Sequence, residues 1–235
     1  MKIVLYTHSD CKDVCIPFFG QLNKFMKDFE KVIFTNAIFD GIPNDYTVIT
    51  YDNSCSYKDR IISCLKKINN GAILFIHEDM ILYNMPDFDV LSEFEGLVLD
   101  KQADFIKLIK AGNFSADSLH KNLVRPPLDN LFSIQPTICL KENLEKIFST
   151  VNANTIYEIE RIISGVCIRL GLDKCYMASC DEENKRGTMH WDSKIFPYIA
   201  TAVVKGRWNY LEYSNELENI LQEYGIDKNK RGLFN

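Results

Sequence analysis

Residues 71–83 read GAILFIHEDMILY. The apolar run at 72–76 has the length and composition of a strand that is buried on both faces. The run ends in His77, Glu78 and Asp79, and apolar residues follow again. Because an ionised carboxylate is costly to bury without a partner, two carboxylates at the end of an internal strand indicate that another group of the protein, or a ligand, neutralises them.

The composition is close to that of an average soluble globular protein. Hydrophobic residues make up 46% of the 235 residues and charged residues 25%, so we expect a well-packed core. The net charge of −5 and the pI of about 5.5 argue against a protein that mainly binds the backbone of nucleic acids, although a local pocket for one phosphate ester stays open. We find no secretory signal and no apolar stretch that could span a bilayer, and we expect a soluble protein of the cytoplasm.

None of the eight cysteines lies in a Cys-x-x-Cys pair. Zinc ribbons and redox dithiols use tighter, paired spacings. We therefore expect free thiols and a reducing compartment.

The first half of the chain alternates short apolar runs with amphipathic stretches. Between the first two runs, and again between the last two, apolar residues fall at helical spacing. This order predicts a largely parallel sheet with helices on both faces. The predicted strands are residues 2–7, 31–36, 46–51 and 72–77.

Three of the predicted strands end in a short polar cluster. The clusters are residues 7–10, 52–54 and 77–79. In open sheets of this class, ligands bind at the carboxyl ends of the strands. We therefore expect the three clusters to line one shared cleft.

The second half is more irregular. No internal repeat or low-complexity linker separates it from the first half, which favours a single domain over residues 1–235. Residues 113–130 are expected to form a long loop or lid, and residues 181–187 a charged, exposed connection. A further strand is predicted at residues 131–140, and helices at 141–149 and 155–170.

The carboxylates of Glu78 and Asp79 suit a divalent cation. Oxygen ligands are those that Mg²⁺ and Mn²⁺ prefer, and the metal removes the cost of burying the two charges. The alternative is that both residues begin a turn in solvent. Their place at the end of an apolar strand, with more apolar residues after them, favours the metal site.

The order of these segments resembles the nucleotide-sugar half of GT-A glycosyltransferases. In that family an acidic Asp-x-Asp motif follows a comparable strand and is associated with Mg²⁺ or Mn²⁺ that bridges the sugar-nucleotide diphosphate. The chain is similar to small stand-alone enzymes of bacterial surface-polysaccharide clusters and of large DNA viruses. The matching segments are YTHSD (6–10), YDNSCSYKDR (51–60), FIHEDM (75–80) and KIFPYIATAVVKGRWN (194–209).

The resemblance implies one GT-A-like, Rossmann-related α/β domain with a mixed, mostly parallel sheet flanked by helices. Residues 1–110 would bind the nucleotide sugar and residues 111–235 the acceptor. The implied reaction moves a sugar from a nucleoside diphosphate sugar, UDP- or GDP-linked, to a hydroxyl of a glycan acceptor. The implied location is the cytoplasm, which for a viral enzyme is that of the host.

The same resemblance carries the metal role onto particular residues. Asp79 matches the acidic motif as the metal ligand, and Glu78 is a second ligand or a ribose contact. His190 is implied as a further ligand, because some GT-A enzymes use a C-terminal histidine in this way; a surface histidine in a loop is the alternative. His77 departs from the family pattern, since it stands where the first aspartate is expected.

Eleven residues are implied as contacts of the nucleotide sugar. Ordinary structural alternatives are an Asx turn for Asp52, an exposed helix side chain for Arg60, and a helix C-cap beside a packing tryptophan for Lys205 and Arg207. The implied contacts are Thr7, His8, Ser9, Asp52, Asn53, Tyr57, Arg60, His77, Glu78, Lys205 and Arg207.

The predicted helix at 155–170 supplies a candidate general base. With about 100° per residue, one apolar stripe forms, and Glu160 lies about 80° from its centre. The stripe consists of Ile156, Ile159, Ile163, Val166 and Leu170. Glu158 lies about 120° away, nearer to solvent. A carboxylate at the edge of an apolar stripe is partly desolvated, which suits a general base. The resemblance to inverting GT-A enzymes therefore places the base at Glu160, with Glu158 in reserve; a solvated helix face is the alternative.

Two other functions stay open. A sugar-nucleotide nucleotidyltransferase shares the sheet and the carboxylate-bound metal, but it typically has a glycine-rich N-terminal loop, which residues 6–13 lack. A non-catalytic nucleotide-sugar-binding protein is the second, suggested by His77. The GxGxxG, GxxxxGK[ST] and GxSxG motifs are absent, which disfavours dinucleotide reductases, P-loop enzymes and α/β-hydrolases.

Overall fold

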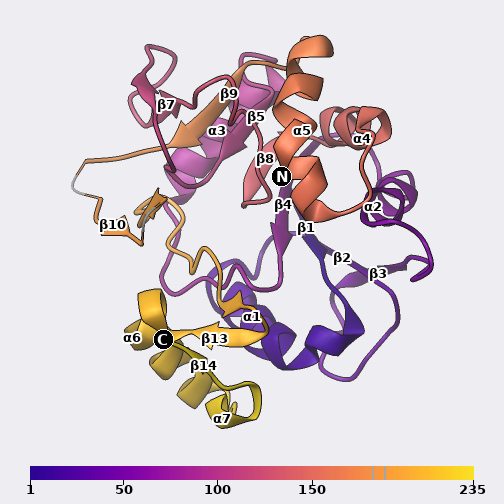
Figure 1. Cartoon of the computed structure of the whole chain (residues 1–235), viewed down its shortest axis with the longest axis vertical. Helices are drawn as coiled ribbons and strands as arrows, with labels where there is room; N and C mark the ends of the chain where they lie inside the picture. Colours follow the sequence, from indigo (N-terminus) through magenta and orange to yellow (C-terminus); the bar gives the residue numbers. More distant parts are fainter. Residues whose placement is uncertain (182, 188) are drawn as a thin grey trace.

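The computed structural model describes residues 1–181, 183–187 and 189–235. Its centre is a nine-stranded sheet with the order β3-β2-β1-β4-β8-β5-β9-β7-β6 (Figure 1). The strands are β1 (Lys2–Tyr6), β2 (Lys31–Thr35), β3 (Thr47–Thr50), β4 (Ala72–His77), β5 (Phe105–Lys107), β6 (Ser115–Ala116), β7 (Leu123–Arg125), β8 (Thr137–Leu140) and β9 (Cys175–Ala178).

The first half of the sheet is parallel, as the sequence predicts. Strand β1 pairs in parallel with β2 and with β4, so that Val4 lies between Val32 and Phe75. Strand β3 continues the parallel order beyond β2. All residues of β2 and β4 are buried, which is why both strands read as continuous apolar runs. Only β8 and β7 run against the other strands, and the predicted mixed, mostly parallel sheet is confirmed.

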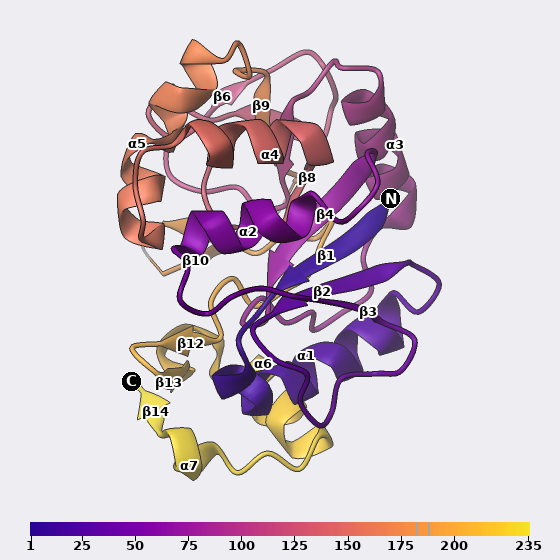
Figure 2. The ribbon, with the colours of Figure 1, turned by 90° about the vertical axis from the view of Figure 1, so that its right-hand side faces the viewer.

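Helices cover both faces of the sheet. Helices α2, α4 and α5 gather on one side, where α2 packs on α4 and α4 on α5, and α3 lies on the other side (Figures 1 and 2). Helix bounds in the sheet-forming part are α1 (Lys12–Phe25), α2 (Tyr57–Leu65), α3 (Phe88–Leu99), α4 (Lys141–Thr150) and α5 (Ile156–Arg169). In the described part of the chain, no helix is both long enough and apolar enough to cross a membrane.

The second half differs from prediction in two segments. Residues 113–130 are not a structureless lid, because β6 and β7 pair within them and β7 extends the sheet beyond β9. The strand predicted at 131–140 is only β8, and residues 131–136 form a loop. The helices predicted at 141–149 and 155–170 are α4 and α5.

The predicted exposed connection at 181–187 is partly ordered by ion pairs. The side chain of Glu183 is fully buried against Lys110, and Arg186 binds Asp192. Residue 182, which belongs to this segment, lies outside the described residues. The short strands β10 (Lys185–Arg186) and β11 (His190–Trp191) pair here.

The C-terminal segment forms a small sheet of its own. Strands β12 (Val203–Val204) and β13 (Arg207–Asn209) form a hairpin, and β14 (Leu233–Phe234) pairs in parallel with β13. The two-residue turn is Lys205-Gly206, both with positive φ, as a type I′ turn requires. Helices α6 (Tyr210–Glu223) and α7 (Lys228–Arg231) complete the segment, which lies below the carboxyl ends of β1 and β4 in Figure 2.

Candidate functional site

The three polar clusters predicted from the sequence meet at the carboxyl edge of the sheet. Nε2 of His8, after β1, lies 3.1 Å from Oδ1 of Asn53, after β3. The hydroxyl of Tyr57, at the start of α2, lies 2.9 Å from Nε2 of His77, at the end of β4. Contacts between segments far apart in the sequence therefore bring the polar ends of these strands together at one edge of the sheet.

Glu78 and Asp79 are two half-buried carboxylates at this edge. Within residues 1–181, 183–187 and 189–235, no lysine or arginine forms an ion pair with either of them. Burial raises the pKa of Glu78, while hydrogen bonds from the Cys11 and Thr7 side chains oppose the rise. Burial, and second the neighbouring Glu78 carboxylate, raise the pKa of Asp79. Such a pair can hold a divalent cation, because a bound cation would offset both the burial of the two charges and the repulsion between them.

His77 is part of the hydrophobic core rather than of the acidic pair. Its side chain is 8% exposed, and its ring lies 5.2 Å from the ring of Tyr6 and 5.6 Å from that of Phe75. Burial lowers the pKa of His77 to about 3, so the imidazole is neutral and its Nε2 pairs with the Tyr57 hydroxyl. The residue that departs from the acidic motif thus has a structural partner of its own.

Arg60 holds the loop after β3 through hydrogen bonds to its backbone. Its Nη2 donates to the carbonyl of Asn53 at 2.5 Å and its Nε to the carbonyl of Cys55 at 2.8 Å. The guanidinium also lies over the Tyr51 ring, 5.3 Å from the centroid, and Tyr51 stacks on Tyr6 at 5.4 Å. Arg60 therefore fixes this loop through backbone and aromatic contacts.

Asp52 forms the Asx turn that was the alternative in the sequence. One carboxylate oxygen accepts from the backbone N–H of Ser54 at 2.8 Å and from its hydroxyl at 2.7 Å. These hydrogen bonds lower the pKa of Asp52, the backbone one most. Asp52 is thus an acceptor for its own turn.

The loop after β1 is fixed by contacts on both sides. The Thr7 hydroxyl lies 3.1 Å from Sγ of Cys15, and the Thr7 carbonyl accepts from the Tyr51 hydroxyl at 2.7 Å. Nδ1 of His8 accepts from the backbone N–H of Asp10 at 3.2 Å. Ser9 exchanges two hydrogen bonds with Asn36. His8 is partly exposed, as is Ser9, and Nε2 of His8 is turned to Asn53.

Arg231 is a functional candidate that the sequence did not indicate. Its guanidinium grips both carboxylate oxygens of Asp13 at 2.6 and 3.0 Å. The Asp13 carboxylate raises the pKa of Arg231 most, and Cys11 and Glu78 add to the rise. Arg231 is therefore a C-terminal cation held at the start of α1 by Asp13, and the charge of Glu78 adds only a small part to its raised pKa. The polar residues around Arg231 in the sequence do not indicate its contact with Asp13, which lies 218 residues earlier in the chain.

The two cations predicted near the nucleotide sit elsewhere on the C-terminal hairpin. Lys205 is the first residue of its turn, and its Nζ lies 5.9 Å from the centroid of the Phe234 ring. Arg207 is exposed in β13. The turn replaces the helix C-cap considered in the sequence, while Trp208 is fully buried, as a packing tryptophan would be.

Glu160 and Glu158, the candidate bases on α5, have different surroundings. Glu158 forms a capping box with Thr155, and these hydrogen bonds, led by that from the Thr155 backbone, lower the pKa of Glu158. Oε1 of Glu160 accepts from the backbone N–H of Ile134 at 2.8 Å, and no other described residue forms a hydrogen bond with this carboxylate. Glu160 thus retains an oxygen for another ligand, whereas Glu158 is committed to its helix.

The loop that Glu160 binds reaches toward Asp79. Gln135 follows Ile134, and its Oε1 accepts from the Tyr198 hydroxyl at 2.7 Å. The charge of Asp79 contributes to the raised pKa of Tyr198, although burial is the largest cause. Glu160 therefore fixes the loop whose next residue, Gln135, binds Tyr198.

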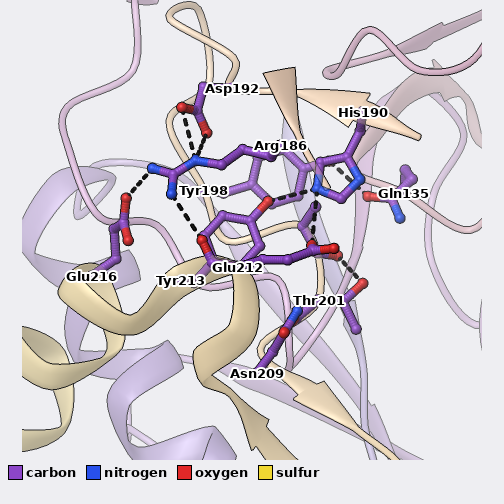
Figure 3. Close-up of polar contacts among 11 residues, drawn as sticks. Gln135, Arg186, His190, Asp192, Tyr198, Thr201, Asn209, Glu212, Tyr213 and Glu216 are labelled. Atoms are coloured by element: carbon purple, nitrogen blue, oxygen red, sulfur yellow. Dashed lines mark hydrogen bonds and ion pairs between the residues drawn. The ribbon is translucent and has the colours of Figure 1, made fainter. Parts of the chain in front are cut away.

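His190 belongs to a second polar cluster (Figure 3). Its Nε2 lies 2.8 Å from the Tyr213 hydroxyl and 3.7 Å from Oε2 of Glu212, and burial lowers the pKa of His190. No three His, Cys, Asp or Glu side chains gather as a metal site within the described residues. The predicted set of Asp79, Glu78 and His190 is therefore not assembled around one point.

Comparison with known proteins bears on the fold. No family model and no curated protein sequence matches the chain. The crystal structure of TarS from S. aureus superposes with a TM-score of 0.51 at 14% identity, over 98% of this chain and 41% of the TarS chain. The chain thus spans less than half the length of that structure. The likeness confirms the predicted Rossmann-related, GT-A-like α/β fold.

Two further structures are similar at a lower level. The mannosyltransferase PcManGT from Pyrobaculum calidifontis, in complex with GDP-Man and Mn²⁺, gives a TM-score of 0.47 at 11% identity, over 77% of this chain and 54% of that one. A nucleotidyl transferase from Methanothermobacter thermautotroptrophicus gives 0.46 at 11% identity, over 77% of this chain and 87% of that one.

Proposed function

We propose that the protein is a glycosyltransferase that moves a sugar from a UDP- or GDP-linked donor to a hydroxyl of a glycan acceptor. The observation that carries the proposal is the Glu78–Asp79 pair, half-buried at the carboxyl edge of the sheet with no cationic side chain of the described residues bound to it. Clefts at this edge are the usual ligand sites of open α/β sheets. The fold shared with TarS agrees with the proposal.

In this proposal Asp79 is the metal ligand and Glu78 its neighbour. Two carboxylates whose charged forms are disfavoured by burial fit Mn²⁺ or Mg²⁺. A divalent ion bound there would neutralise the charge that grows on the leaving diphosphate. His8 and Asn53 would contact the nucleotide, since their side chains meet at the same edge. Arg231 would face the diphosphate from the C-terminal segment.

Glu160 is the proposed general base. Its Oε1 is fixed by Ile134, which orients the second oxygen for the proton of an acceptor hydroxyl. Gln135, on the same loop and bound to Tyr198, would border the acceptor. Glu158 is the weaker candidate, because its carboxylate is already engaged at the N-terminus of α5.

A panel of UDP- and GDP-linked sugars, incubated with the protein and MnCl₂, tests the proposal. Release of UDP or GDP from one donor, faster with a glycan acceptor present, is the expected result. Formation or consumption of pyrophosphate would instead identify a nucleotidyltransferase. Thermal stabilisation by a donor without any turnover would identify a binding protein. Either of the last two results would overturn the proposal.

A further inference from the structure

A pocket lies between β11, the β12–β13 hairpin and the start of α6. Its volume is about 250 Å³, slightly below the range of about 300 to 1,000 Å³ that is typical of small-molecule sites. The apolar part of its wall is Met189, Val204 and Phe234. The polar part is His190, Thr201, Asn209 and Glu212, which Figure 3 shows converging from three elements.

Asn209 has an unused acceptor in this pocket. The residue is 3% exposed, and its Nδ2 donates to the carbonyl of Thr201 at 3.0 Å. Its Oδ1 is buried without a hydrogen-bond partner among the described residues. A buried acceptor left unpaired is costly, so a ligand hydroxyl or N–H at this position would remove an existing penalty.

Arg186 and a kink in α6 build a rigid frame for Glu212. Nη1 of Arg186 donates to the backbone carbonyl of Glu212 at 2.8 Å, and Nε and Nη2 of the same side chain bind Asp192 and Glu216. Tyr213 leaves the helical conformation, with φ −129° and ψ 35°. The side chain of Glu212 points to His190 and is 24% exposed.

The polar groups of the pocket are mainly acceptors. Oδ1 of Asn209 can only accept hydrogen bonds, and so can the ionised Glu212 carboxylate. The Thr201 hydroxyl already donates to the Ala200 carbonyl at 2.8 Å. No lysine or arginine among the described residues lines the pocket, which disfavours a phosphate group. A neutral ligand with several hydroxyl groups and an apolar ring face matches this lining, with the ring face on Val204 and Phe234.

The pocket adjoins the end of β4 through the backbone. The N–H of Asn209 donates to the carbonyl of Ala202 at 2.9 Å, and the N–H of Ala202 donates to the carbonyl of Asp79 at 2.8 Å. Thr201 precedes Ala202 in the chain. A group bound against Thr201 and Asn209 is therefore a near neighbour of the acidic pair.

We infer that this pocket binds one sugar ring of the acceptor, with Glu212 and Asn209 accepting hydrogen bonds from its hydroxyl groups. The role as an acceptor subsite rests on the proposed glycosyltransferase function, whereas the binding of a sugar ring rests on the pocket alone. The two parts can therefore fail separately.

The test is saturation-transfer NMR on the full chain with methyl glycosides of glucose, galactose, mannose and N-acetylglucosamine, without donor. At least one glycoside should give a signal, and Glu212→Gln, which keeps the side chain's size, should reduce it several-fold. Val204→Trp, which fills the pocket from a partly exposed strand, should abolish it. Glu218→Gln is the matched control, because Glu218 is on the same helix but is bound to Tyr210 and Lys228.

No signal from any of the four glycosides would overturn the inference, as would equal signals in the wild type, Glu212→Gln and Val204→Trp. Titration of UDP and GDP with MnCl₂ separates this from the proposed function. Glycoside binding that is lost in the two pocket variants, in a protein that binds neither nucleotide, would support the sugar pocket and contradict the transferase.

Discussion

The backbone N–H of Ala202 donates a hydrogen bond to the backbone carbonyl of Asp79, with 2.8 Å between nitrogen and oxygen. This bond attaches the C-terminal hairpin to the acidic end of β4. Arg231, from the same C-terminal segment, binds Asp13 at the start of α1. Residues from the last third of the chain therefore form a wall of the site that the first half of the sheet provides.

Tyr57→Phe should destabilise the protein. The change removes the hydroxyl that lies 2.9 Å from Nε2 of His77 and leaves a buried ring nitrogen unpaired, which costs about 1 to 3 kcal/mol. Urea denaturation measures the free energy of unfolding. Tyr157→Phe is the control, because Tyr157 is 83% exposed. Equal stabilities of the two variants would show that the Tyr57–His77 contact contributes nothing.

Glu160→Gln should slow sugar transfer about 100-fold or more, the usual contribution of a general base, while donor affinity is retained. The amide can still accept from the N–H of Ile134, so the loop at 131–136 keeps its anchor. Glu160→Ala removes the anchor as well. Normal transfer by the glutamine variant together with slow transfer by the alanine variant would make Glu160 a positioning residue.

Arg231→Gln should weaken nucleotide binding by about tenfold, the size expected for losing one charge-assisted contact. Arg207→Gln supplies a comparison in the same C-terminal segment, since Arg207 is exposed and Arg231 binds Asp13. Isothermal titration with UDP and GDP gives both affinities. A larger loss in Arg207→Gln would reverse the assignment of the diphosphate cation.

Lys107 should make stability rise with pH in the alkaline range. The side chain is 1% exposed, its Nζ donates to the carbonyl of Asn130, and burial lowers the pKa of Lys107 from 10.5 to about 8. Between these two values the unfolded chain binds more protons than the folded one, so raising the pH stabilises the folded state.

The measurement is the free energy of unfolding of the wild type minus that of Lys107→Met. This difference should rise by about 2 kcal/mol between about pH 7 and pH 10. The contributions of other titrating groups to the free energy of unfolding largely cancel in this difference. Lys66→Met, at an exposed position, should show no such trend, and a flat difference for Lys107→Met would refute the perturbed lysine.

The sequence predicts the parallel half of the fold well because its inner strands β1, β2 and β4 are almost entirely buried. Strand β4 is found with its bounds unchanged, and β1 and β2 each end one residue earlier than predicted. The C-terminal hairpin escapes prediction for physical reasons. Its strands have two and three residues, too few to show alternation, and its Lys-Gly turn lacks the usual Asn or Asp before glycine.

The site is predictable where a single segment decides it. The polar ends of β1, β3 and β4 follow from strand position, and the Asx turn at Asp52 follows from local chemistry. Arg231 and Asn209 depend instead on how the C-terminal segment docks, which no short pattern encodes. His77 is a third case, because its partner Tyr57 lies twenty residues earlier in the chain.

The most direct measurement is isothermal titration of UDP and GDP into the wild type and into Asp79→Asn, each with and without MnCl₂. Asp100→Asn is the control, because Asp100 is an exposed aspartate at the end of α3. We expect Mn²⁺ to tighten binding of one nucleotide to the wild type and to Asp100→Asn by at least about tenfold, and to have no effect on Asp79→Asn. Equal tightening in Asp79→Asn would contradict a metal–diphosphate site at the end of β4.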